Sequence, residues 1–163
     1  MSLKINPDYF RSIVFGCQDA LVSTTGVVVG ISVGVQNRQF IILSGLVTIA
    51  VEALSMGVGQ YLSEKSVHQL PGSNHKDNLI TGGVLMFLFY LIGGFVPLLP
   101  IFFTLPPFSS LLSVAFAFVG LFTLGFFKAK LFASHIWRSA FEMLVLGGLA
   151  TLIGLAVGLI FKI

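Results

Sequence analysis

The stretch IVFGCQDALVSTTGVVVGISVGV, from Ile13 to Val35, decides the fold class of this chain. It is mostly apolar, and it is long enough to cross a bilayer as a helix, which takes roughly 20 residues. A second apolar run extends from Phe40 to Tyr61. Each run contains one acid, Asp19 in the first and Glu52 in the second. Because a charge in hydrocarbon is costly, both acids are candidate functional residues.

The composition also indicates a membrane protein. Of the 163 residues, 56% are hydrophobic and 9% are charged, whereas soluble domains carry roughly a quarter charged residues. The only cysteine, Cys17, lies inside the first apolar run, so no intrachain disulfide can form. The basic residues are scattered at the expected helix ends and form no patch, so we expect no nucleic-acid partner.

Five apolar segments predict an all-α membrane protein with five transmembrane helices in a single domain over residues 1–163. The expected helices span about 12–35, 40–62, 79–103, 108–131 and 139–161. Each must be helical, because lipid offers no partner to an unpaired backbone group. We expect one longer loop, Ser63–Asn78, and we expect Pro106 and Pro107 to separate the third and fourth helices.

The distribution of Lys and Arg predicts the orientation. With a cytoplasmic N-terminus, seven of the nine basic residues lie on the cytoplasmic side: Lys4, Arg11, Lys65, Lys76, Lys128, Lys130 and Arg138. Arg38 and Lys162 then lie on the other side. This asymmetry follows the positive-inside rule, so the C-terminus is expected outside the cell or in a lumen.

Asp19, Ser23, Gly26, Gly30 and Gly34 recur every three or four residues and so share one face of the first helix. Glycines at this spacing let another helix approach closely. One interpretation is tight packing within a single bundle. The other is an interface that lines a polar path, and the acid on the same face favours it.

The second helix carries a polar face made of Ser44, Thr48, Glu52, Met56 and Gln60, each four residues apart. A carboxylate and a thioether one turn apart can reach the same ion, and this pair of ligands suits Fe(II) or Mn(II) better than Mg or Ca. Taken alone, Met56 is better explained as a side chain that fills a gap in the core than as a metal ligand. No Lys or Arg is expected at the depth of Glu52, which favours a mobile cation or a proton as its partner.

Other polar residues have simpler explanations. Glu142 lies one turn after Arg138 and is expected to form an ion pair with it. His68 and His75, together with Glu64 and Asp77, could form a weak metal-entry patch, although a solvated loop explains them as well. No nucleophile and base pattern or phosphate-binding loop is present, so we expect no catalytic residues and no enzyme.

Five stretches, taken in order, resemble the vacuolar iron transporter family. They are RSIVFGCQDALVS (Arg11–Ser23), EALSMGVGQYLSEKS (Glu52–Ser66), GGFVPLLP (Gly93–Pro100), GFFKAKL (Gly125–Leu131) and RSAFEMLVLGG (Arg138–Gly148). The resemblance implies a five-helix homodimer in the lipid bilayer that carries Fe²⁺, and often Mn²⁺, out of the cytoplasm in exchange for protons. It also implies an ion path at the dimer interface, between the first and second helices.

The resemblance assigns metal binding to Asp19, Glu52 and Met56. Ser23, Thr48, Gln60 and Glu64 are candidates for the path or its cytoplasmic mouth, and Gly26, Gly30 and Gly34 for the dimer interface. Gln60 stands where the family usually has an acid, and Ala20 where it has glycine. The place of the long cytoplasmic metal-binding domain of plant and fungal members holds only a loop, so the chain resembles a short form.

The sequence therefore predicts a metal exporter with no permanently bound cofactor, whose cargo is Fe²⁺ or Mn²⁺ and whose coupling ion is H⁺. Two alternatives stay open: a passive divalent-cation channel, and a membrane scaffold or accessory subunit that transports nothing. The expected location is the inner membrane of a prokaryotic cell, or the vacuolar membrane if the source is eukaryotic.

Overall fold

The computed structural model describes residues 6–71, 78–131 and 135–162. These residues form the helices α1 (Pro7–Gly34), α2 (Arg38–His68), α3 (Leu79–Phe103), α4 (Phe108–Leu131) and α5 (Ile136–Ile160). All five helices are long and apolar enough to cross a membrane. The prediction of an all-α protein with five transmembrane helices is confirmed.

Asparagine side chains cap the first three helices. Asn6 accepts a hydrogen bond from the backbone of Asp8, with Pro7 in the first turn, which explains why α1 begins earlier than residue 12. Asn37 and Asn78 cap α2 and α3 in the same way. These side chains satisfy backbone N–H groups that have no partner within the helix.

The expected loop from Ser63 is wrong in its first part, because α2 continues to His68. Glu64 lies in this added stretch and is 5% exposed, and its carboxylate forms an ion pair with Arg11 of α1. A contact with a helix distant in sequence therefore stabilises the last turns of α2.

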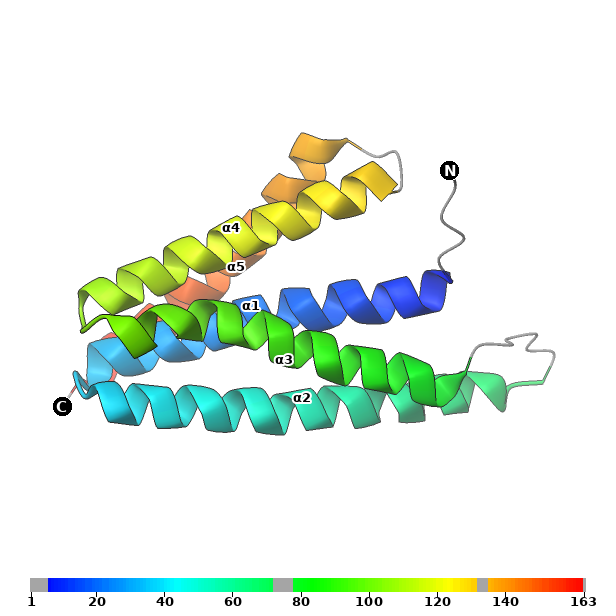
Figure 1. Cartoon of the computed structure of the whole chain (residues 1–163), viewed down its shortest axis with the longest axis horizontal. Coiled ribbons are helices and arrows are strands. Elements are labelled where there is room, and N and C mark those ends of the chain that lie inside the picture. Colours follow the sequence, from blue (N-terminus) through cyan, green and yellow to red (C-terminus); the bar gives the residue numbers. More distant parts are fainter. Residues whose placement is uncertain (1–5, 72–77, 132–134, 163) are drawn as a thin grey trace.

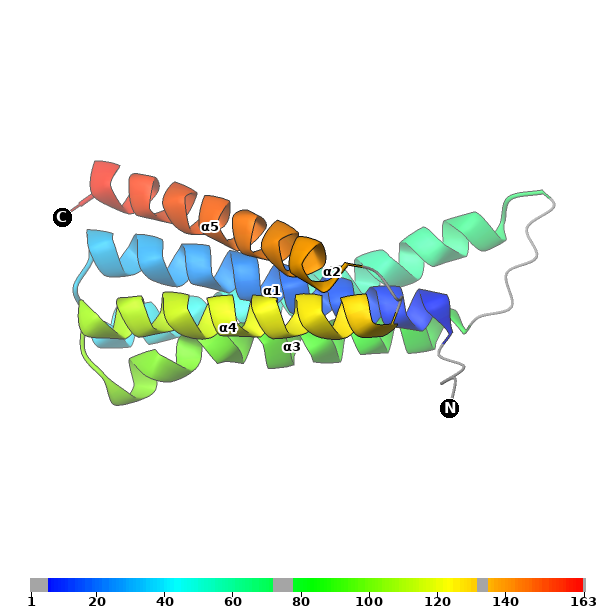
Figure 2. The ribbon, with the colours of Figure 1, turned by 90° about the horizontal axis from the view of Figure 1, so that it is seen from above.

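The central helix of the bundle is α1, which contacts each of the other four. On one side of it α2 and α3 lie together, while α4 and α5 form a second pair that diverges from α1 toward the end that carries the N-terminus (Figure 1). In the described residues α5 contacts neither α2 nor α3, and Figure 2 shows α5 and α3 on opposite sides of α1. The two chain ends lie at opposite ends of the bundle, as an odd number of antiparallel helices requires (Figure 1).

The end of α3 is bound to the start of α2 by one side chain. Ile101 and Phe102 lie in the last turn of α3, where the backbone carbonyls have no donor within the helix. The guanidinium of Arg38 donates to the carbonyl of Ile101, over 2.8 Å, and to that of Phe102. These contacts hold α2 and α3 together at the end of the bundle opposite the N-terminus.

The outer surface of the described helices is apolar. Leu111 of α4, Phe141 of α5 and Ile160 of α5 are each at least 65% exposed, and many other large hydrophobic residues are exposed along the helices. Exposing so large an apolar surface to water is unfavourable, whereas lipid chains can cover it.

Candidate functional site

Tyr90 connects the candidate residues of three helices. Its ring is fully buried in the middle of α3, among Ala20 of α1 and Ala53 of α2. Its hydroxyl donates a hydrogen bond to Glu52 Oε2 and lies 2.6 Å from Ser23 Oγ. A buried phenol normally places its hydroxyl on a polar partner, and here it has one on α1 and one on α2.

Asp19 lies one turn before Ser23 on α1, and its carboxylate is close enough to Glu52 for the two to repel each other electrostatically. Both side chains are half-buried. In the described parts of the chain, Asp19 has no hydrogen-bond or ion-pair partner, and Glu52 has only the neutral hydroxyl of Tyr90. Two acids therefore lie near each other within the span, and in the described residues no basic side chain is paired with either.

Met56 lies one turn from Glu52 and packs against the group formed by Ala20, Ala53 and Tyr90. Thr48 lies one turn from Glu52 in the opposite direction. Both side chains are half-buried, as are Ser44 and Gln60, so the predicted polar face of α2 lies at the edge of the bundle. Met56 therefore packs against the cluster that contains the ring of Tyr90, whose hydroxyl reaches Glu52, and the role of Thr48 in an ion path stays a prediction.

A second polar cluster lies at the end of the bundle that carries the N-terminus. Gln60 Nε2 donates a hydrogen bond to Glu64 Oε1 over 3.0 Å, and Arg11 forms an ion pair with the same carboxylate. These three residues line a cavity of about 380 Å³, which Asp8, Phe15, Ser63, Val67 and Met86 complete. Along α2 this cluster begins about 12 Å from Glu52, given a rise of 1.5 Å per residue.

The glycines of α1 lie against α5 of the same chain. A Cβ atom on Gly30 would be 2.8 Å from the carbonyl oxygen of Gly154, and one on Gly26 would be 3.2 Å from that of Ala150. A Cβ atom on Gly34 would lie 3.6 Å from the carbonyl oxygen of Gly158, which is an ordinary contact distance. The approach of the two backbones at Gly30 is so close that it requires glycine.

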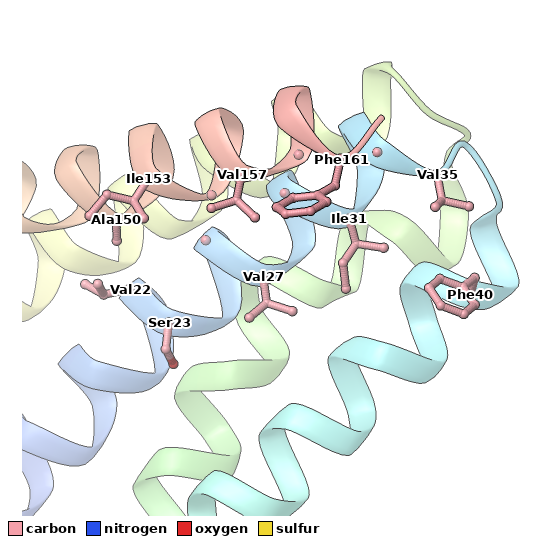
Figure 3. A pocket seen from close by; sticks show the side chains of 15 residues that line it. Val22, Ser23, Val27, Ile31, Val35, Phe40, Ala150, Ile153, Val157 and Phe161 are labelled. Atoms are coloured by element: carbon pink, nitrogen blue, oxygen red, sulfur yellow. The ribbon is translucent and has the colours of Figure 1, made fainter. Parts of the chain in front are cut away.

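The same glycines line one wall of a largely apolar groove of about 630 Å³. Figure 3 shows Val27 and Ile31 of α1 in this groove, with Phe40 of α2 and Phe161 after α5 toward its far end. Ser23 lies at the other end, so the groove begins beside the acids. The glycines have a partner within the chain, and their role in a dimer interface stays a prediction.

The sequence also singles out charged residues and histidines other than the two acids within the span. Arg138 Nε lies 3.2 Å from Glu142 Oε1 on the exposed side of α5, so the expected ion pair is confirmed. Glu64 is buried and paired with Arg11, whereas His68 is at the end of α2. His75 and Asp77 lie outside the described residues. In the described residues no three His, Cys, Asp or Glu side chains gather where a metal could bind.

Sequence reasoning missed Tyr90 and the pairing of Arg11 with Glu64. A signal for Tyr90 exists, since a phenol in the middle of the apolar span Leu79–Phe103 needs a polar partner. Its partners are 38 and 67 residues away along the chain, so only the fold identifies them.

Comparison with known proteins identifies the family. The family model of the VIT family matches residues 10–78 and 67–159, which together include most of all five helices. The chain belongs to the VIT family. It is an integral membrane protein with the short connection expected between α2 and α3, where residues 69–78 separate the two helices.

Three relatives in the VIT family come from plants. Vacuolar iron transporter homolog 2 of Oryza sativa subsp. japonica is 28% identical over 168 residues, which cover 91% of this chain and 88% of the relative. Vacuolar iron transporter homolog 3 of Arabidopsis thaliana is 32% identical over 75 residues, or 46% of this chain and 36% of the relative. Homolog 4 of the same plant is 27% identical over 103 residues, or 56% and 52%. The chain therefore aligns with nearly all of the rice protein but with only a part of each Arabidopsis protein.

Proposed function

We propose that this protein carries Fe²⁺ or Mn²⁺ out of the cytoplasm in exchange for protons. The observation that supports it is the proximity of Asp19 and Glu52 within the membrane span, with no basic side chain paired to either in the described residues. Uncompensated carboxylates in lipid are costly, and a cation that passes between them removes the cost. The names of the plant relatives, vacuolar iron transporter homologs, agree with a metal cargo.

The donor atoms favour a transition metal over Mg²⁺ or Ca²⁺. Asp19 and Glu52 offer carboxylate oxygens, the hydroxyls of Ser23 and Tyr90 lie beside them, and Met56 adds a thioether. Oxygen with one soft sulfur suits Fe²⁺ and Mn²⁺. One chain supplies only two acids here, so water or a second chain would complete the coordination.

Exchange for protons follows from the same carboxylates. A metal ion and a proton compete for the carboxylate oxygens of Asp19 and Glu52, because each neutralises the same negative charge. Protons that enter from the side opposite the cytoplasm would release the metal there. The hydroxyl of Tyr90 already donates to Glu52 and keeps that carboxylate oriented in the absence of metal.

A homodimer would protect the polar face from lipid. The side chains Asp19, Glu52, Met56 and Gln60 are all half-buried, so in a single chain part of each would face hydrocarbon. A second copy related by two-fold symmetry covers the same patch on both chains and doubles the number of acids. The ion path would then lie between the two copies, next to α1 and α2.

Transport by purified protein in liposomes tests this function. We expect uptake of Fe²⁺ and Mn²⁺ that is driven by a pH gradient and lost in Asp19→Asn and Glu52→Gln, because both changes keep the size and remove the charge. The matched control is Glu142→Gln, which removes an exposed acid of α5 from its pair with Arg138 and should transport as the unchanged protein does.

Other outcomes assign other functions. Metal flux that is unaffected by the pH gradient would make the protein a passive channel. Absence of flux from a correctly folded protein would support a scaffold and contradict transport. Normal flux in both Asp19→Asn and Glu52→Gln would place the path elsewhere in the molecule.

A further inference from the structure

A third pocket lies between α1 and α4, at the end of the bundle that carries the N-terminus. Its volume is about 290 Å³, near the lower end for small-ligand sites. It is lined by Phe10, Arg11, Val14, Phe15, Gln18 and Lys128. It belongs to a different face of α1 from the groove of Figure 3, which α2 and α5 border.

Lys128 is the residue that makes this pocket unusual. Its side chain is half-buried in the last turn of α4, and in the described residues no hydrogen bond or ion pair satisfies it. Lys130, also in the last turn of α4, is exposed and does not line the pocket. A lysine that only extended its ammonium group into water would resemble Lys130 more than Lys128.

Arg11 adds a second positive charge to the same pocket. Its side chain is 59% exposed, and its guanidinium forms an ion pair with Glu64. A second, longer ion pair joins the guanidinium to Asp8 Oδ1 over 3.9 Å. A guanidinium has five N–H donors, so donors remain for a further acceptor. Gln18 contributes an uncharged amide to the wall of the pocket.

The pocket combines positive charge with an apolar wall at the depth of a lipid headgroup. Lys128 lies in the last turn of α4 and Arg11 in the second turn of α1, so both are at the ends of membrane spans. Phe10, Val14 and Phe15 provide an apolar surface that a free phosphate ion would not use. Basic pockets between transmembrane helices bind anionic headgroups by this combination.

We propose that this pocket binds the phosphate group of an anionic phospholipid. Lys128 and Arg11 contact the phosphate, Gln18 hydrogen-bonds to its oxygens or to the headgroup, and the phenylalanine and valine side chains contact the upper part of the acyl chain. The lipid fills the space that opens where α4 diverges from α1, and it supplies the negative charge that Lys128 lacks.

Native mass spectrometry and thermal unfolding of the detergent-purified protein test the proposal with added phosphatidylglycerol. The unchanged protein should retain phosphatidylglycerol more tightly than phosphatidylcholine and unfold at a higher temperature with it. Lys128→Gln should weaken the retention of phosphatidylglycerol roughly fivefold, the factor that corresponds to about 1 kcal/mol for one basic residue near an anionic surface. Lys130→Gln is the matched control and should retain the lipid as the unchanged protein does.

Further arms separate the alternatives. Lys128→Arg should restore binding, which distinguishes lost charge from a folding defect in Lys128→Gln. Equal retention of phosphatidylcholine, or equal losses in Lys128→Gln and Lys130→Gln, would overturn the proposal. The same stabilisation by inorganic phosphate alone would assign the pocket to a soluble anion instead of a lipid. None of these measurements depends on metal transport, so their failure leaves the proposed function untouched.

Discussion

Tyr90 holds Glu52 and Ser23 in place with a single hydroxyl, and its ring is fully buried. The Tyr90→Phe change removes the oxygen and keeps the ring. Because a hydrogen bond to a charged group contributes about 1.5–3 kcal/mol, we expect a measurable loss of thermal stability and a several-fold drop in metal uptake. Both are measured on the same purified protein, by thermal unfolding in detergent and by uptake into liposomes.

Tyr61→Phe is the matched control for Tyr90→Phe. Tyr61 is half-buried on α2, and its hydroxyl has no hydrogen bond in the described residues, so its loss should change neither measurement. Uptake by Tyr90→Phe equal to that of the unchanged protein would show that the phenol only fills the core.

The sulfur of Met56 should affect the choice of metal. Met56→Leu keeps the volume of the side chain and removes the soft donor, so Fe²⁺ uptake should fall more than Mn²⁺ uptake. Met143→Leu is the control, since Met143 is buried in a different apolar cluster, against Leu21 and Leu121. An equal effect of Met56→Leu on both metals would identify Met56 as a packing residue.

The contact between α1 and α5 depends on glycines of both helices. A Cβ atom on Gly154 would overlap the carbonyl of Gly26, which is backbone and cannot rotate away. Gly154→Ala should therefore lower the free energy of unfolding by about 1–3 kcal/mol, the usual cost of overpacking. Thermal unfolding of Gly154→Ala and of the unchanged protein in detergent measures this loss of stability.

Gly148→Ala provides the control on the same helix. A Cβ atom at Gly148 meets nothing within 4 Å, so this change should be neutral or slightly stabilising. If both alanine variants unfold at the same temperature as the unchanged protein, α1 and α5 are less closely packed than described.

The whole bundle should place the end of α2 and the chain's C-terminal end on opposite sides of the membrane. Gln69→Cys and Lys162→Cys, each in a Cys17→Ser background, should react with an impermeant thiol reagent from opposite sides. The positive-inside rule predicts that residue 69 is cytoplasmic. Both variants should react after the membrane is permeabilised, which controls for accessibility. Labelling of both from one side in intact vesicles would contradict the topology.

The acids could be predicted from the sequence because a charge in an apolar run is conspicuous wherever the helices pack. The hydrogen-bond partners of those acids could not be predicted from the sequence. Tyr90 reaches Glu52 and Ser23 only because α3 packs against both α1 and α2, and the sequence alone does not specify which helices are neighbours. The glycines of α1 were predictable only in part for the same reason. Their spacing predicts a close helix contact, but it does not identify α5 as the partner.

The ends of the helices could also be predicted only in part from the sequence. The bounds of α3 and α4 agree with the sequence, because Asn78 and the two prolines before Phe108 act locally. The end of α2 does not, because Glu64 is stabilised there by Arg11, which is distant in sequence. Helix ends set by neighbouring residues, as in α3 and α4, can therefore be predicted from the sequence. The end of α2 depends on a contact between helices, so only the fold determines it.

The central position of α1 has a consequence for how the protein is made. Of the five spans, α1 has the lowest hydropathy, and it leaves the ribosome first. The residues that shelter its polar and glycine faces, Tyr90 on α3 and Gly154 on α5, are synthesised later. Asp19 is therefore synthesised before the residues of α3 and α5 that pack against α1. A chain that stops before α5 therefore leaves the glycine face of α1 without the helix that covers it.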